Sequence, residues 1–338
     1  MKKCIPALAL LALSLPLCAQ SADRQTAAQP VQKTNRYAMK LSENEDGTYS
    51  IINEARYAKI VDLSAIPDLY TPYTYTNVRL FSRDYKKVET EEIVFKKYDS
   101  YELKIAVDKA ISDTPSPVMF YVHGGGWARG NFDSSRSLSR YLAQQKGITG
   151  VRVSYTLAPQ PGANVEVSIR DVMDAVAYVR EHAEELNVNP DLIGFYGTSA
   201  GAHLAAVAAM QCPQTKVFVG ASGIYDLTTA AITQRTKDPQ RIAYFEDRDP
   251  QLLRDVSPYY LVPRKRKIAA LLFCGTADIV VECSQSREFA RRLKSANRKN
   301  VVDLEEYRYY DHNLSSKSSD KMEEVFFKTV DFVAEHLK

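Results

Sequence analysis

The sequence predicts an α/β fold in which a mostly parallel sheet is covered by helices on both faces. Strand-like and helix-like segments alternate from Val118 onward, which is the pattern of parallel strands joined by crossover helices. The 338 residues are 45% apolar and 25% charged, as expected for an ordinary globular protein with a sizeable core. A hairpin pattern precedes the alternation and adds antiparallel strands to one edge of the sheet.

Each element follows from a local pattern. Two segments that alternate apolar and polar residues, 90–96 and 101–107, predict the hairpin. Short apolar runs predict strands at 118–122, 148–154, 191–196, 216–221, 268–274 and 301–307. Apolar residues at helical spacing and alanine-rich runs predict helices at about 134–145, 165–186, 202–210, 282–296 and 320–337. Residues 224–263 interrupt the alternation and contain four prolines, so we expect a small cap-like insertion over the sheet edge.

The N-terminus has the layout of a cleavable secretory signal. Two lysines precede an apolar stretch, 5–17, and small and polar residues follow it. The stretch is too short to span a bilayer comfortably, so we expect a signal peptide at 1–21, no stable membrane span, and secretion or export to the periplasm. Lipid anchoring at Cys18 is the weaker alternative, because lipoprotein signals usually carry a small residue where this chain has Leu17.

The rest of the chain is expected to contain one domain. Residues 22–40 are polar and show no apolar period, which predicts a flexible leader. Residues 41–338 are expected to form a single domain that includes the insertion. The stretch 41–89 is rich in tyrosine without a clear period and receives no assignment.

Charge and cysteine content exclude several classes of protein. The net charge of +3 gives no reason to expect a nucleic-acid partner, and the basic run 264–267 is expected to be a solvated loop. Loss of the signal leaves Cys212, Cys274 and Cys283, which do not make a disulfide framework. One bridge with a free thiol and three buried thiols are both open, with Cys274 expected as a core thiol. No cysteine–histidine spacing indicates a metal site.

The most informative motif is the run Gly197-Thr198-Ser199-Ala200-Gly201, which spells G-x-S-x-G between a predicted strand and an alanine-rich helix. In this setting the serine lies on a sharp turn that exposes its hydroxyl at the carboxyl edge of the sheet. Glycine is expected on both sides because the serine backbone is strained and its neighbours pass too close for a side chain. Ser199 is therefore the candidate nucleophile.

A serine hydroxyl needs a base that accepts its proton, and His312 is the best placed of the five histidines. It lies in a loop after a predicted strand and before the last helix, where such a base belongs in this architecture. His203 follows the serine by four residues and is expected to pack, while His182 and His336 are expected at the surface.

The acid that orients the base is expected to be Asp278. It follows the strand 268–274 and gives the chain order Ser, Asp, His. Asp303 and Glu305 lie inside a predicted strand, and Asp311 is adjacent to the base and cannot easily face it.

The chain also has candidate donors for the negative charge of a tetrahedral intermediate. The run His123-Gly124-Gly125-Gly126-Trp127 follows a predicted strand and supplies amides that no side chain obstructs. Ala200 supplies another amide from the start of the helix after the serine. We expect Gly124, Gly125 and Ala200 to form the oxyanion hole.

Together these four motifs resemble the α/β-hydrolase fold and, more narrowly, esterases of the hormone-sensitive-lipase-like and bacterial feruloyl/acetyl-xylan-esterase-like groups. The run 155–159, followed by Asp171 and Ala175, is similar to those families too. The resemblance covers about 90–338. It implies a two-step hydrolysis of a small carboxylic ester through an acyl-Ser199 intermediate, without a metal or organic cofactor.

Two departures from the lipase-like pattern leave alternatives open. Trp127 stands where many lipase-like relatives carry phenylalanine and is shared with arylformamidase-like members, and Val280-Val281 after the acid resembles feruloyl-esterase-like and peptidase-like branches. An amidase or peptidase with the same triad is therefore one alternative. The other is a non-catalytic binding protein of this fold, although such proteins usually lose a triad member. The substrate-binding residues and the oligomeric state stay unassigned.

Overall fold

The computed structural model describes residues 33–34, 39–43, 49–53, 57–62, 88–315 and 321–338. The chain divides into two compact units, Met1–Val61 and Asp62–Lys338. The predicted signal peptide and Cys18 lie outside the described residues, as does most of the predicted leader. The expected start of the domain at residue 41 falls within the first unit.

The N-terminal strands form a small sheet of their own in chain order. Its strands are β1 (Lys33–Thr34), β2 (Met39–Glu43), β3 (Tyr49–Asn53) and β4 (Tyr57–Asp62). β1 pairs with β2 and β2 with β3, both antiparallel. These strands occupy parts of the 22–40 stretch expected to be a leader and of the 41–89 stretch that received no assignment.

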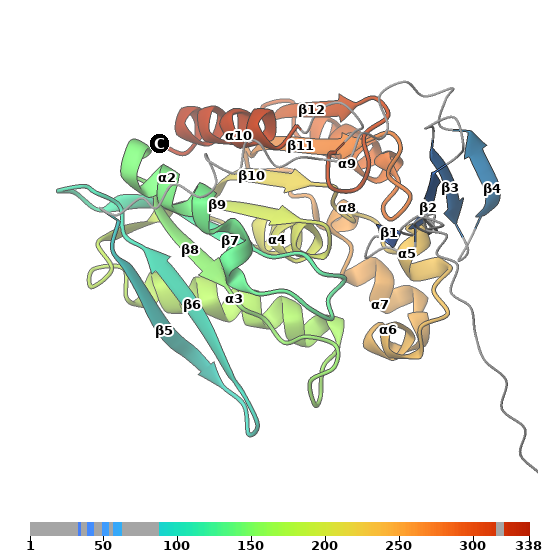
Figure 1. Ribbon diagram of the computed structural model, residues 1–338. Helices are drawn as coiled ribbons and strands as arrows, with labels where there is room; N and C mark the ends of the chain where they lie inside the picture. Colours follow the sequence, from blue (N-terminus) through green and yellow to red (C-terminus); the bar gives the residue numbers. More distant parts are fainter. Residues whose placement is uncertain (1–32, 35–38, 44–48, 54–56, 63–87, 316–320) are drawn as a thin grey trace, which may run out of the picture. The chain divides into compact units, whose positions relative to one another are not determined.

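The second unit is built on an eight-stranded sheet with the order β12-β11-β10-β9-β7-β8-β6-β5 (Figure 1). All neighbours from β12 to β8 pair in parallel, and β6 and β5 continue antiparallel at the edge. The strands are β5 (Thr90–Lys97), β6 (Glu102–Asp108), β7 (Ser116–Val122), β8 (Thr149–Val153), β9 (Val188–Thr198), β10 (Thr215–Ala221), β11 (Ala269–Gly275) and β12 (Val301–Tyr307). This arrangement confirms the predicted mostly parallel sheet with a hairpin at its edge.

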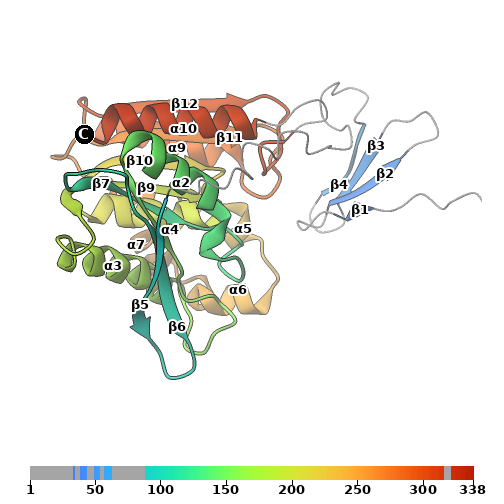
Figure 2. The same cartoon turned by 60° about the vertical axis from the view of Figure 1, so that its left-hand side comes forward.

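Helices cover both faces of this sheet, as Figures 1 and 2 show. One core layer packs α3, α4 and α9 against the sheet, and the layer on the opposite face packs α2 and α10. Their bounds are α2 (Arg136–Lys146), α3 (Val165–Glu181), α4 (Ala200–Gln211), α9 (Cys283–Ala296) and α10 (Met322–His336). Because both faces are covered, central strands such as β11 are buried at every residue and read as continuous apolar runs. In the described ranges, no helix combines the length and apolarity needed to cross a membrane.

The helix that follows the candidate nucleophile, α4, is buried along almost its whole length. Every residue from Ala200 to Met210 is buried, and only Gln211 at the end is exposed. The helix contacts β7, β9 and β10 on one side and α3 and α8 on others. A helix that is apolar all round belongs inside a protein, and here its alanines allow close approach to the sheet. The nucleophile turn is therefore attached to the most buried helix described.

The insertion between β10 and β11 contains short helices. They are α5 (Ala231–Gln234), α6 (Pro239–Tyr244), η3 (Glu246–Arg248), α7 (Pro250–Asp255) and α8 (Pro258–Leu261). Proline stands at the start of α6, α7 and α8, where its missing N–H costs nothing and its φ suits a helix. Three of the four prolines that marked the interruption in the sequence thus begin helices, and the fourth, Pro263, follows α8.

A buried histidine connects the insertion to α4. The Nε1 of Trp127 donates to Nδ1 of His203 at 3.2 Å, and Nε2 of His203 donates to the carbonyl of Val256 at 2.8 Å. His203 is fully buried, and desolvation lowers its pKa from 6.5 to about 4. The packing role expected for this residue agrees with its position.

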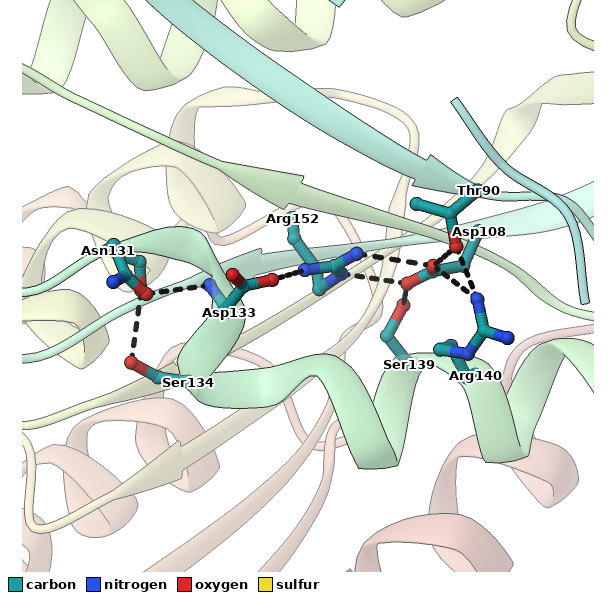
Figure 3. A network of polar contacts seen from close by, with 8 residues as sticks. All are labelled: Thr90, Asp108, Asn131, Asp133, Ser134, Ser139, Arg140 and Arg152. Carbon is teal, nitrogen blue, oxygen red and sulfur yellow. Dashed lines mark hydrogen bonds and ion pairs between the residues drawn. The ribbon is translucent and has the colours of Figure 1, made fainter. Parts of the chain in front are cut away.

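A buried ionic network joins the edge of the sheet to α2 and to the segment before it (Figure 3). Arg152 on β8 donates from Nε to Oδ2 of Asp108 at 2.8 Å and from Nη1 to Oδ1 of Asp133 at 2.6 Å. Asp108 on β6 also accepts hydrogen bonds from the hydroxyls of Thr90 and Ser139. Arg152 and Asp108 are both buried, so each charge needs a compensating partner, and their shared ion pair is the shortest that Asp108 makes.

Replacement of Arg152 by methionine should therefore destabilise the fold strongly. Asp108 would keep its hydroxyl donors but lose its main cationic partner, and breaking a buried pair in this way costs about 3–5 kcal/mol. The free energy of unfolding in urea measures the loss. Arg291→Met is the control, because its pair with Glu288 is exposed and is worth less than about 1 kcal/mol. Equal losses in the two variants would contradict the role given to the network.

The neutrality of His203 should make stability depend on pH. Above pH 6.5 the side chain is neutral in both states and contributes no dependence. As the pH falls from 6.5 toward 4, the unfolded chain binds a proton that the folded chain excludes, so stability decreases by about 3 kcal/mol in total. Urea unfolding at pH 7.5, 6 and 5 should show this decrease in the wild type and a weaker one in His203→Gln. The same pH dependence in both proteins would refute the assignment.

Candidate active site

Ser199 lies at the sharp turn between β9 and α4. β9 ends at Thr198 and α4 begins at Ala200, so the serine stands between them. Its φ is +53° and its ψ −124°, a conformation that strains a non-glycine backbone by roughly 1–3 kcal/mol. The Ser199 amide donates to the carbonyl of Ala221 at 2.9 Å, which ties the turn to the end of β10. The turn has the strained geometry that the G-x-S-x-G pattern predicts.

The glycines on either side of the turn are required by close backbone contacts. A Cβ on Gly197 would lie 2.4 Å from the carbonyl oxygen of Gly201. A Cβ on Gly201 would lie 2.2 Å from the carbonyl oxygen of Val122, at the end of β7. Neither position can hold a side chain unless the backbone moves. As expected, glycine is needed at both positions because neighbouring backbone passes too close for a side chain.

The structure brings Ser199, His312 and Asp278 together at the carboxyl ends of three parallel strands. The Oγ of Ser199 lies 2.9 Å from Nε2 of His312. The Nδ1 of His312 lies 2.7 Å from Oδ2 of Asp278. Because an aspartate can only accept, Nδ1 of the imidazole carries the proton and Nε2 is left to accept one from the serine. The imidazole and the aspartate are buried, and the geometry suits a serine whose proton is removed by the histidine.

The second oxygen of Asp278 fixes the orientation of the carboxylate. Oδ1 accepts hydrogen bonds from the amides of Val280 at 2.8 Å and Val281 at 2.9 Å. The carboxylate is thus held from one side by the backbone and from the other by the imidazole. Of the rival carboxylates, Asp303 is exposed on β12 and Glu305 pairs with Lys328, so neither is bonded to the imidazole.

Asp311 and Ser222 shape the loop that presents His312. Oδ1 of Asp311 accepts from the amides of Asn313 at 2.8 Å and Ser315 at 3.0 Å, and the hydroxyl of Ser222 donates to the carbonyl of His312 at 2.9 Å. Burial raises the pKa of Asp311. Sequence reasoning rejected Asp311 as the acid but missed this role. The sequence does contain a signal for this role, because an aspartate in a loop commonly accepts a hydrogen bond from the backbone amide two residues later, here that of Asn313.

The expectation that Cys274 is a core thiol is wrong. Cys274 at the end of β11 forms a disulfide with Cys283 at the start of α9, and Cys212 is a buried free thiol. The apolar run around Cys274 concealed the pairing, because the chain turns back after β11 and brings the two Cα atoms within 5.3 Å. The bond joins the two ends of the segment that carries Asp278.

The glycine loop after β7 runs against the nucleophile turn. A Cβ on Gly124 would lie 2.8 Å from the carbonyl oxygen of Thr198 and 3.3 Å from Cβ of Ser199. In the part of the chain that the structure describes, the amides of Gly124, Gly125 and Ala200 donate to no other protein group. Backbone donors left unused beside a serine can receive the negative charge of an oxyanion. Of the three residues expected to form the oxyanion hole, Gly124 therefore lies against the serine turn and Ala200 follows the serine, while Gly125 is the next residue of the loop.

His123 and Tyr155 hold the first part of this loop. The Tyr155 hydroxyl donates to the carbonyl of His123 at 3.0 Å, and Nδ1 of His123 donates to the carbonyl of Gly124 at 2.8 Å. The two rings stack with centroids 4.4 Å apart. Burial lowers the pKa of His123, so this imidazole favours the neutral form and supports the loop.

A small hollow, open to solvent, lies beside the loop and the insertion. Its lining residues are Gly126, Ala128, Ala158, Asp238, Gln240, Arg241 and Tyr244. The insertion therefore contributes polar side chains next to the glycine loop. No group of three or more histidine, cysteine, aspartate or glutamate side chains in the described ranges could hold a metal ion.

Curated relatives include esterases of bacteria. The chain is 37% identical over 97 residues to the acetyl esterase of Salmonella schwarzengrund, which corresponds to 29% of each chain. It is 29% identical over 218 residues to the esterase LipC of Mycobacterium tuberculosis, which covers 58% of this chain and 53% of that protein. The chain thus spans between about a third and half of the length of these relatives.

Solved structures give the same fold over a longer stretch. Esterase 2 of Thermogutta terrifontis phosphoramylated by tabun has a TM-score of 0.60 at 25% identity, covering 73% of this chain and 94% of that one. Its propionate-bound form also gives 0.60 at 25% identity, covering 75% and 96%. The sequence profile of the family described as BD-FAE matches residues 103–293, which is more than half of the chain. The protein therefore has the α/β-hydrolase fold and belongs to the BD-FAE family.

Proposed function

We propose that the protein is a serine carboxylesterase that hydrolyses small carboxylic esters through an acyl-Ser199 intermediate. The observation that carries the proposal is the continuous hydrogen-bonded series from Ser199 Oγ through His312 to Asp278. The unused amides beside the serine supply the second requirement of ester hydrolysis, which is a place for the oxyanion. The esterase relatives and the membership in the BD-FAE family support the same reaction.

In the first half of the reaction, Ser199 Oγ attacks the ester carbonyl carbon while Nε2 of His312 accepts the hydroxyl proton. The carbonyl oxygen becomes negative and is stabilised by the amides of Gly124, Gly125 and Ala200. When the tetrahedral intermediate collapses, the bond to the alcohol oxygen breaks and the imidazolium gives that oxygen its proton. Asp278 keeps the proton-bearing Nδ1 in place and stabilises the transient imidazolium.

In the second half, water takes the position that the alcohol left. His312 accepts a proton from the water as its oxygen attacks the acyl carbon. Collapse of the second intermediate breaks the bond to Ser199 Oγ, which receives the proton back from the imidazolium. The carboxylic acid leaves, and the triad returns to its starting state. All proton transfers use groups of the chain and water.

Short acyl groups are the proposed substrates. One relative is named an acetyl esterase, and esterase 2 of Thermogutta terrifontis has been solved with propionate and with butyrate bound. We infer that the substrate approaches along the side of the glycine loop that faces the insertion, where Gly126, Asp238 and Arg241 line a small hollow.

Export from the cytoplasm is part of the proposal. Residues 1–21 carry the signal-like pattern described above. The Cys274–Cys283 disulfide supports an oxidising compartment, because stable disulfides are rare where thiols are kept reduced. Fractionation of cells that produce the full chain, with mass spectrometry of the mature N-terminus, tests this part.

Ser199→Ala should abolish hydrolysis and labelling. The purified protein is incubated with p-nitrophenyl acetate, propionate, butyrate and octanoate, and separately with a fluorophosphonate probe. Without the hydroxyl the rate should fall by at least about 10³-fold, since only binding and the oxyanion hole remain. Ser295→Ala, an exposed serine on α9, is the control and should keep full activity. A wild type that neither turns over esters nor reacts with the probe would contradict the proposal.

The same purified wild-type protein also tests the alternative that the chain is an amidase or peptidase. Matched p-nitroanilides and N-formyl arylamines are compared with the p-nitrophenyl esters at equal concentration. Ester hydrolysis is expected to exceed amide hydrolysis by a larger factor than the chemical reactivity difference of the two substrates. Faster amide than ester turnover by the wild type would assign the chain to the amidases instead.

Asp278→Asn should reduce kcat while the fold is kept. The amide group presents an N–H to the imidazole and favours the wrong tautomer, so the loss is expected to be about 10³- to 10⁴-fold. Asp303→Asn on β12 is the control and should stay within about twofold of the wild type. Circular dichroism and thermal unfolding establish that both variants fold. Equal activity of Asp278→Asn and wild type would remove Asp278 from the triad.

A further inference from the structure

Trp127 and His203 connect the glycine loop directly to the helix of the nucleophile. Trp127 follows the three glycines of the loop, and His203 lies on the first turn of α4, four residues after Ser199. Both side chains are fully buried, and the indole Nε1 lies 3.2 Å from Nδ1 of the imidazole. The loop and the nucleophile are therefore held to the same helix through one hydrogen bond.

Only one protonation state of His203 satisfies both of its partners. An indole N–H can only donate, so Nδ1 must accept. The partner of Nε2 is the carbonyl of Val256 at 2.8 Å, which can only accept, so Nε2 must carry the proton. A buried neutral imidazole with this tautomer is thus matched on both sides. Its low pKa agrees with this state.

The loop needs such support because its backbone is strained. Gly125, Gly126 and Trp127 follow one another with φ of +123°, +63° and +59°. A left-handed conformation is rare for a bulky residue such as tryptophan, and it persists only where the surroundings hold it. Here the Trp127 ring contacts Phe245 edge-on at 5.0 Å, and its N–H is bonded to His203. The side chain of Trp127 therefore holds the backbone that precedes it.

We propose that His203 is a positioning residue of the esterase reaction, which acts through Trp127 on the amides of Gly124 and Gly125. By accepting the Trp127 hydrogen bond, it keeps these donors at a constant place relative to Ser199 on its own helix. The inference rests on the proposed function. Donors misplaced by about 1 Å lose much of their effect on the transition state, whereas ground-state binding depends on them little.

Two amide substitutions separate the partners of His203. In His203→Asn, Oδ1 takes the place of Nδ1 and can still accept from Trp127, while the donor to Val256 is lost. In His203→Gln, Nε2 takes the place of the ring Nε2 and can still donate to Val256, while the acceptor for Trp127 is lost. The inference predicts that the acceptor matters for catalysis and the donor for the attachment of the insertion.

With p-nitrophenyl acetate, kcat should fall about 10- to 100-fold in His203→Gln, with KM within about twofold of the wild type. His203→Asn should keep kcat within about fivefold. The inhibition constant of a trifluoromethyl ketone, which forms an oxyanion on the serine, should rise in parallel with the loss of kcat in His203→Gln. Unchanged kcat in His203→Gln, or a larger loss in His203→Asn, would overturn the inference.

A double-mutant cycle tests whether the effect passes through the indole. Trp127→Phe keeps a ring in the core but removes the donor, so it should lower kcat about as much as His203→Gln. The double variant should be no slower than either single variant by more than about threefold, because both remove the same bond. Losses that multiply would overturn the inference. If His203→Gln does not fold, Trp127→Phe alone tests the inference. Full kcat in Trp127→Phe would then overturn it.

The outcomes distinguish this inference from the proposed function. If the wild type does not hydrolyse esters and its Ser199 does not react with a fluorophosphonate, the proposed function fails. If the wild type reacts at Ser199 and the two acceptor-removing variants retain full kcat, only the role of His203 fails.

Discussion

Close backbone contact between the nucleophile turn and the end of β7 is the constraint on which the site depends. The carbonyl groups of Val122 and His123 lie where a side chain on Gly201 would have to go, at 2.2 and 2.4 Å. β7 leads into the glycine loop, and the turn carries Ser199. The same contact therefore sets how far the loop amides lie from the serine. A change at Gly201 would separate the serine from the donors that face its reaction.

Around this contact, the parallel sheet and the loops have different roles. The sheet brings the ends of β9, β11 and β12 to one edge, since parallel strands point their carboxyl ends the same way. It does not orient side chains in the loops that follow. That task falls to hydrogen bonds from side chains to backbone, such as those of Tyr155, Ser222 and Asp311. Precision at the site thus comes from groups outside the triad.

Features that depend on a short local pattern could be predicted from the sequence. The turn at Ser199, the glycine loop and the order of acid and base follow from short motifs between apolar runs, and the sheet follows from alternation of elements. Features that depend on how distant segments meet were not predictable in this way. The pairing of Cys274 with Cys283 required the path of the turn after β11, and the helix α3 ends at Glu181 although apolar spacing continues to Leu186, because the chain must turn to enter β9.

The order of the parallel strands has a consequence for synthesis of the chain. The serine turn closes once β7, β9, α4 and β10 are present, but the base lies 113 residues after the serine, beyond β12. A ribosome makes these parts in sequence, so the nascent polypeptide contains the serine before its proton acceptor has been made. Hydrolytic competence therefore arises only after His312 has been made, and a product that stops before it has the serine but lacks its base.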